Sequence, residues 1–146
     1  MYGFIPVNSA PATVLFDPRA SHPFISSQYV EDHKITMLPI RKLVIINSLG
    51  GEVKADHICP KVSLDIKGVN FVANLIILES MEIDVILGQG WLYACKGVIK
   101  YAQHLVLLTT PSGERIEYEG IQPVPVDDVD KKRKAISLKT PMKKSY

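Results

Sequence analysis

Apolar and polar residues alternate over most of the first 120 positions, which is the pattern of short β-strands separated by turns. Gly3–Asn8 and Ala12–Phe16 are apolar runs joined by Ser9–Pro11, and they predict a hairpin that ends at Asp17. Further along, Val62–Ile66 alternates and turns at Gly68. The chain returns through the following ten residues to make another hairpin.

A Gly-Gly pair marks a further hairpin between these two. Leu43–Asn47 and Glu52–Ile58 have strand-like composition and flank Ser48, Leu49, Gly50 and Gly51. Glycine accepts positive φ, so this tetrapeptide is suited to a tight turn. We therefore expect a β-arm with a glycine-containing tip.

The remaining elements are shorter. Phe24, Ile25, Tyr29 and Val30 fall at helical spacing, so Ser21–His33 predicts one short helix with Pro23 in its first turn. The other expected elements are a strand over Ile83–Leu87 ending at a close-packed turn at Gly88, a helical turn or two over Trp91–Cys95, a strand pair from Gly97–Tyr101 and His104–Thr109, and a strand over Arg115–Tyr118 that closes the sheet.

These elements predict an all-β fold with one or two short helices in a single domain over residues 1–120. No internal repeat is present in the sequence. From Ile121 to Val126 two prolines interrupt the pattern, and the charged segment that follows has too few apolar residues to form a core. Residues 121–146 are therefore expected to be a disordered tail or linker.

Composition narrows the class of protein. At 47% hydrophobic and 22% charged residues the chain resembles an ordinary soluble globule. The net charge of +2 divides into +4 for Asp127–Tyr146 and −2 for the rest, so the body is not expected to bind nucleic acid. The basic run Lys131–Lys134 is interpreted as a solvated linker, with weak RNA contact as the alternative. No signal sequence or membrane span is recognisable, which predicts an intracellular, cytoplasmic protein.

The reactive side chains form no recognisable metal or nucleophile site. Cys59 and Cys95 lack metal-ligand spacing and are expected to be buried free thiols. His57 lies two residues from Cys59, but no second pair would complete a zinc site. Ser21 and His22 are neighbours without a carboxylate to orient the base. No metal or cofactor is predicted.

Three segments in order resemble one family. In Ala12–Ser26 an apolar strand runs into Asp17, and Ala-Ser-His at positions 20–22 follows. This segment resembles the active-site segment of retropepsin-like aspartic proteases of plant gypsy-type retrotransposon polyproteins, where Asp-Ser-Gly or Asp-Thr-Gly precedes Ala-Ser-His. Leu49–Glu52 is similar to the flap of that family, and Asp84–Leu92 to its apolar-apolar-Gly segment. The resemblance covers residues 3 to about 119.

The resemblance implies one lobe of an aspartic protease, a small closed or partly open barrel. It also implies two aspartates that share a proton and activate a water against a peptide bond. The chain has one candidate, Asp17, so a complete site requires a homodimer. The implied substrate is a peptide or polyprotein, held by Ala20 and by the flap residues Ser48, Leu49, Gly50 and Gly51. A strand-end or helix-capping role is the alternative for Asp17.

Departures from the family pattern lie in the catalytic loop. Pro18 replaces a Ser or Thr and has neither hydroxyl nor N–H, and Arg19 replaces a glycine. Two Arg19 side chains would favour two ionised aspartates over a shared proton, unless they extend into solvent. Gly90 replaces an acid, a milder change. The hypotheses are an impaired endopeptidase, an inactive relic used for dimerisation or peptide binding, and a β module unrelated to proteases.

Overall fold

The computed structural model describes residues 1–48, 51–79 and 81–121. Its elements in chain order are β1 (Tyr2–Val7), β2 (Ala10–Phe16), β3 (Phe24–Ser26), α1 (Ser27–His33), β4 (Leu38–Ser48), β5 (Gly51–Ile66), β6 (Val69–Leu78), β7 (Val85–Leu87), α2 (Gln89–Ala94), β8 (Val98–Lys100), a 3-10 turn (Tyr101–Gln103), β9 (Leu105–Thr109) and β10 (Arg115–Glu119).

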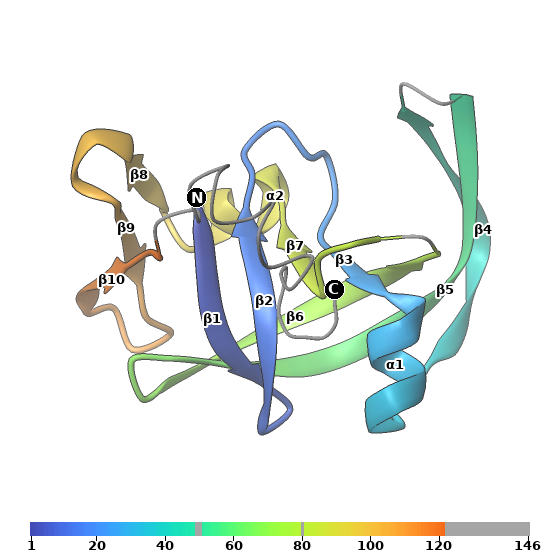
Figure 1. Ribbon diagram of the computed structural model, residues 1–146, viewed down its shortest axis with the longest axis horizontal. Helices are drawn as coiled ribbons and strands as arrows, with labels where there is room; N and C mark the ends of the chain where they lie inside the picture. The colour runs from blue at the N-terminus through green and yellow to red at the C-terminus, as the bar shows by residue number, and fades with distance from the viewer. Residues whose placement is uncertain (49–50, 80, 122–146) are drawn as a thin grey trace, which may run out of the picture.

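Six strands of the described chain form a closed ring (Figure 1). They follow the order β1-β2-β7-β3-β6-β5, and the pairing of Val7 with Leu64 joins β5 back to β1. β4 lies outside the ring and pairs with the first half of β5. Together they form an arm that extends beyond the barrel. The predicted all-β barrel with two short helices is confirmed.

Alternation along the strands places the core inside this ring. In β1 every second side chain is buried, and Ile5 and Val7 point inward. The ring of Phe16 packs 6.3 Å from that of Trp91, and Trp91 lies 5.8 Å from Phe71 by centroid distance. These rings tie α2 to the barrel interior, so the interpretation of Trp91 as a core residue is confirmed.

The helix predicted from Ser21 begins only at Ser27, and that prediction was wrong over its first half. Phe24–Ser26 instead forms β3, which lies between β6 and β7 in the middle of the sheet. The Ser26 hydroxyl accepts a hydrogen bond of 3.0 Å from the Tyr29 amide and caps the helix. Two strand neighbours satisfy the backbone of β3, and this outweighs the helical spacing of its apolar residues.

The last strands form a sheet of their own. Within the described residues β8, β9 and β10 pair in the order β10-β9-β8, so the strand expected over Arg115–Tyr118 closes this smaller sheet. Tyr118 joins it to the barrel, because its hydroxyl oxygen accepts a hydrogen bond of 3.0 Å from the Phe4 amide. A Cβ on Gly3 would lie only 2.7 Å from the Tyr118 hydroxyl oxygen, so the phenol packs directly against this glycine. The two sheets therefore meet through close packing.

The predicted division at residue 120 stays a prediction, because the tail beyond Ile121 lies outside the described residues. In the portion that is described, none of the helices has the length and apolar character needed to cross a membrane.

Candidate active site

Asp17 opens a tight turn at the end of β2. Its amide donates to the Leu87 carbonyl at 3.1 Å, and its carbonyl accepts from the Ala20 amide at 3.1 Å. Pro18 occupies the second position of this turn, where its fixed φ is favourable and no N–H is needed. The substitution by proline is therefore compatible with the backbone of the loop.

The Asp17 carboxylate supports the same turn. Oδ1 accepts a hydrogen bond of 3.0 Å from the Arg19 amide, and the Arg19 Nε lies 3.5 Å away from that oxygen. The Asp17 side chain is 21% exposed, whereas that of Arg19 is 91% exposed. An ion pair with so exposed a partner contributes little to stability. In the single chain the Arg19 side chain is therefore largely exposed while its Nε stays near Asp17, and its orientation in a dimer stays a prediction.

Gly88 brings β7 against the loop that follows Asp17. A Cβ at this position would lie 2.5 Å from the Ala20 carbonyl oxygen and 2.7 Å from that of His22. The Gln89 amide donates to the same Ala20 carbonyl at 2.8 Å. Only glycine allows the two backbones to approach this closely, which confirms the predicted close-packed turn.

Asp84 fastens the other end of β7, and sequence reasoning assigned it no role. Its Oδ2 accepts from the Thr13 amide at 2.9 Å and from the Thr13 hydroxyl at 3.2 Å. In return the Asp84 amide donates to the Thr13 Oγ1 at 3.1 Å, and the Asp84 carbonyl accepts from the Ser26 amide at 2.9 Å. This set of bonds joins β2, β3 and β7. The sequence feature that could have indicated this role is an acidic residue beside an apolar strand.

Tyr29 joins α1 to the β1–β2 hairpin. Its hydroxyl donates to the Ala10 carbonyl at 2.8 Å and lies 3.1 Å from that of Val7. Burial and, second, the charge of Asp84 raise the pKa of Tyr29 well above its usual range. The phenol therefore stays protonated and remains a hydrogen-bond donor over the whole physiological pH range.

The β4–β5 arm contains most of the predicted substrate-binding residues. Ser48 pairs with Gly51 across it, while Leu49 and Gly50 lie outside the described residues. In Figure 1 the arm and the loop between β2 and β3 both extend toward the top of the view. The hairpin itself is confirmed, and peptide binding by its tip stays a prediction, as does binding by Ala20.

Other chemistries find little support in the described residues. Burial raises the pKa of the Cys59 thiol to about 11 and also raises that of Cys95, so neither is a ready nucleophile. Both are free; Cys59 is buried and Cys95 half-buried. His57 contacts the neighbouring Asp56 at 2.8 Å. Across the ranges described, no three His, Cys, Asp or Glu side chains gather where they could hold a metal ion.

Comparison with models of known protein families shows which family the chain belongs to. Residues 1–114 match the model of the retroviral aspartyl protease family. The chain belongs to this family. The hypothesis of a β module unrelated to proteases is therefore excluded.

Solved structures agree with this membership in the retroviral aspartyl protease family. The retroviral protease-like domain of Ddi1 from Leishmania major has a TM-score of 0.60 at 15% identity, over 84% of this chain and 94% of that one. The EIAV protease in complex with the inhibitor HBY-793 has a TM-score of 0.53 at 20% identity, over 64% and 86%. At these identities the likeness establishes the fold alone. The comparison with curated proteins found no match.

Replacing Gly88 by alanine should destabilise this protease-family fold by about 1–3 kcal/mol, because the new methyl group meets backbone oxygens that cannot move aside. Gly90→Ala is the matched control in α2, where a Cβ would meet nothing within 4 Å. It should leave stability unchanged or raise it by up to about 1 kcal/mol. Urea unfolding followed by the fluorescence of Trp91 measures both. Equal stabilities for the two variants would contradict the proposed contact.

Asp84→Ala should lower the free energy of unfolding by about 1–3 kcal/mol, since it leaves the Thr13 amide and hydroxyl without their acceptor. Asp84→Asn retains an acceptor oxygen and should cost less than about 1 kcal/mol. Thermal unfolding of the two variants compares them directly. A loss that is the same for both would indicate that the charge of Asp84, rather than its hydrogen bonds, stabilises the junction.

Proposed function

We propose that this chain is the aspartic endopeptidase domain of a plant gypsy-type retrotransposon polyprotein, and that its activity is impaired. The observation that carries the proposal is the position of Asp17. It begins a tight turn between the end of β2 and Gly88, which follows β7, and its carboxylate is partly exposed. A carboxylate there is accessible to water and to a second copy of the chain.

The proposed chemistry requires two copies. Retropepsins generally act as dimers on polyprotein substrates, and this chain has one candidate catalytic loop. Two Asp17 carboxylates about 3 Å apart would share one proton, because both cannot ionise at that distance. The ionised member removes a proton from water, and the resulting nucleophile attacks the scissile carbonyl.

The substrate would lie extended between the loop and the β-arm. Ala20 on one side and Ser48, Leu49, Gly50 and Gly51 on the other are proposed to hold its backbone by hydrogen bonds. The Ala20 carbonyl already accepts from the Gln89 amide, which fixes the direction of this part of the loop. Its second lone pair remains for a ligand.

The impairment is proposed to arise from the two residues after Asp17. Pro18 has no hydroxyl or N–H with which to join the loops of two subunits. Arg19 is a long cationic side chain at a position next to the Asp17 turn, and a dimer would have to accommodate two such side chains near its two-fold axis. The same two residues favour the second candidate function, an inactive relic that acts at most as a dimerisation or peptide-binding module.

The double substitution Pro18→Ser with Arg19→Gly should raise peptide cleavage. General acid–base catalysis contributes about 10²–10⁴-fold, so at least a tenfold gain over the natural chain is expected if the shared proton is restored. The assay uses a panel of unstructured peptides between about pH 3 and pH 7, where paired carboxylates titrate. Pepstatin should abolish the gained activity.

The control adds Asp17→Asn to the reverted chain, which should remove cleavage while sedimentation and unfolding stay the same. Equal cleavage by the natural and reverted chains would refute the impairment. Absence of cleavage in both, with dimers present, would favour the inactive relic.

A further inference from the structure

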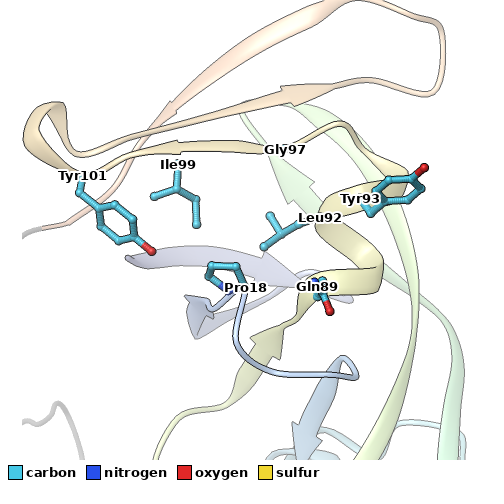
Figure 2. Close-up of a pocket in the computed structure, with 7 residues that line it drawn as sticks. All are labelled: Pro18, Gln89, Leu92, Tyr93, Gly97, Ile99 and Tyr101. Atoms are coloured by element: carbon cyan, nitrogen blue, oxygen red, sulfur yellow. The ribbon is translucent and has the colours of Figure 1, made fainter.

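An apolar groove lies beside the catalytic loop, and the proposed function gives it no role. Its volume is about 340 Å³, at the lower end of the ~300–1,000 Å³ of typical ligand sites. Figure 2 shows it between α2, β8 and Pro18. Its lining residues are Pro18, Gln89, Leu92, Tyr93, Gly97, Ile99 and Tyr101.

The two tyrosines give the groove its chemical character. Tyr93 is 85% exposed and Tyr101 60% exposed, and in Figure 2 they flank the groove at opposite ends. None of the lining residues is charged. Grooves walled by tyrosine and other apolar side chains recognise proline-containing extended segments, because such segments lose little conformational freedom on binding.

The described structure ends at the border of this groove. Ile121 and Tyr101 line one small adjoining hollow of about 190 Å³, and Tyr101 also lines the groove. Ile121 pairs antiparallel with Tyr2, and its amide donates to the Tyr2 carbonyl at 2.9 Å. Because the bridge is antiparallel, the carboxyl end of Ile121 is on the Met1 side of Tyr2.

Met1 in turn lies beside the end of β2. Its carbonyl accepts a hydrogen bond of 2.8 Å from the Phe16 amide, two residues before Pro18. Ile121, the last described residue, is therefore linked through Tyr2 and Met1 to the strand end that leads into Pro18.

The next five residues have the composition that the groove suits. Gln122-Pro-Val-Pro-Val126 carries no charge, and each of its prolines restricts the residue before it to extended conformations. Five residues in a polyproline II conformation span about 16 Å. The first acidic residues, Asp127 and Asp128, come only after this apolar stretch.

We propose that residues 122–126 bind in the groove of their own chain. The prolines and valines pack between Tyr101 and Tyr93 and cover Pro18, the residue after the proposed catalytic aspartate. Because the segment is tethered at Ile121, its effective concentration is of millimolar order, so even a millimolar intrinsic affinity populates the bound form substantially. The inference does not depend on catalysis by Asp17.

The test is isotope-edited NMR on the full 146-residue chain. Nuclear Overhauser effects are expected between the ring protons of Tyr93 and Tyr101 and the side chains of Pro123 and Pro125. Tyr93→Ser should abolish them, and Val72→Ser, a change at a half-exposed site on β6, should not. Pro123→Ser with Pro125→Ser should shift the Tyr101 resonances without altering the barrel, which tests the contact from the tail side.

A mixture of labelled and unlabelled chains separates the possible occupants. Contacts within one chain at every concentration support the proposal. Contacts from the tail of another copy, or from another copy's barrel, would overturn it and assign the groove to an interface between copies. Random-coil shifts for residues 122–126, unchanged by Tyr93→Ser, would also overturn it.

Discussion

The contact between Gly88 and the carbonyls of Ala20 and His22 is the constraint on which the site depends. β7 is only three residues long, yet it pairs with β2 on one side and β3 on the other. The chain joining β2 to β3 must cross the end of β7, and it can do so closely only because no Cβ intervenes. The position of Asp17 follows from this crossing.

Hydrogen bonds fasten both ends of β7. At its beginning, Asp84 exchanges bonds with Thr13 and accepts from Ser26. At its end, the Leu87 carbonyl accepts from the Asp17 amide, and the Gln89 amide donates to Ala20. A short strand held in this way has little freedom to shift register, so the loop that begins at Asp17 is set by the barrel rather than by its own sequence.

This arrangement explains how the loop accommodates Pro18, a residue that does not suit the proposed chemistry. The turn uses the amides of Asp17, Arg19 and Ala20, and it has no need of an N–H at position 18. Proline is favoured there by its fixed φ. The fold and the proposed catalytic chemistry therefore place separate demands on the same four residues, and the hydrogen bonds of the turn meet the demands of the fold.

The sequence predicted much of the barrel because alternation reports directly which strand face is buried. It failed at Phe24–Ser26, where two adjacent apolar residues suit a buried strand as well as a helix and only the neighbours β6 and β7 decide. It also left Asp84 without a role, since its partner Thr13 is 71 residues away and the parallel pairing that joins them has no local signal. The closeness of the Asp17 loop to Gly88 was not predicted either, because it joins segments that are far apart in the sequence.

Arg19 shows why the proposed defect would lie in assembly rather than in folding. In one chain its side chain is 91% exposed, with Nε 3.5 Å from Asp17 Oδ1. In the proposed dimer two such cations would approach a two-fold axis, where losing hydration is costly unless each is paired. Pairing each guanidinium with Asp17 would engage the carboxylates that the proposed chemistry uses, and turning away would require room between the subunits. Either outcome would oppose a close approach of the two aspartates, whereas in one chain Arg19 is not among the residues with positive φ.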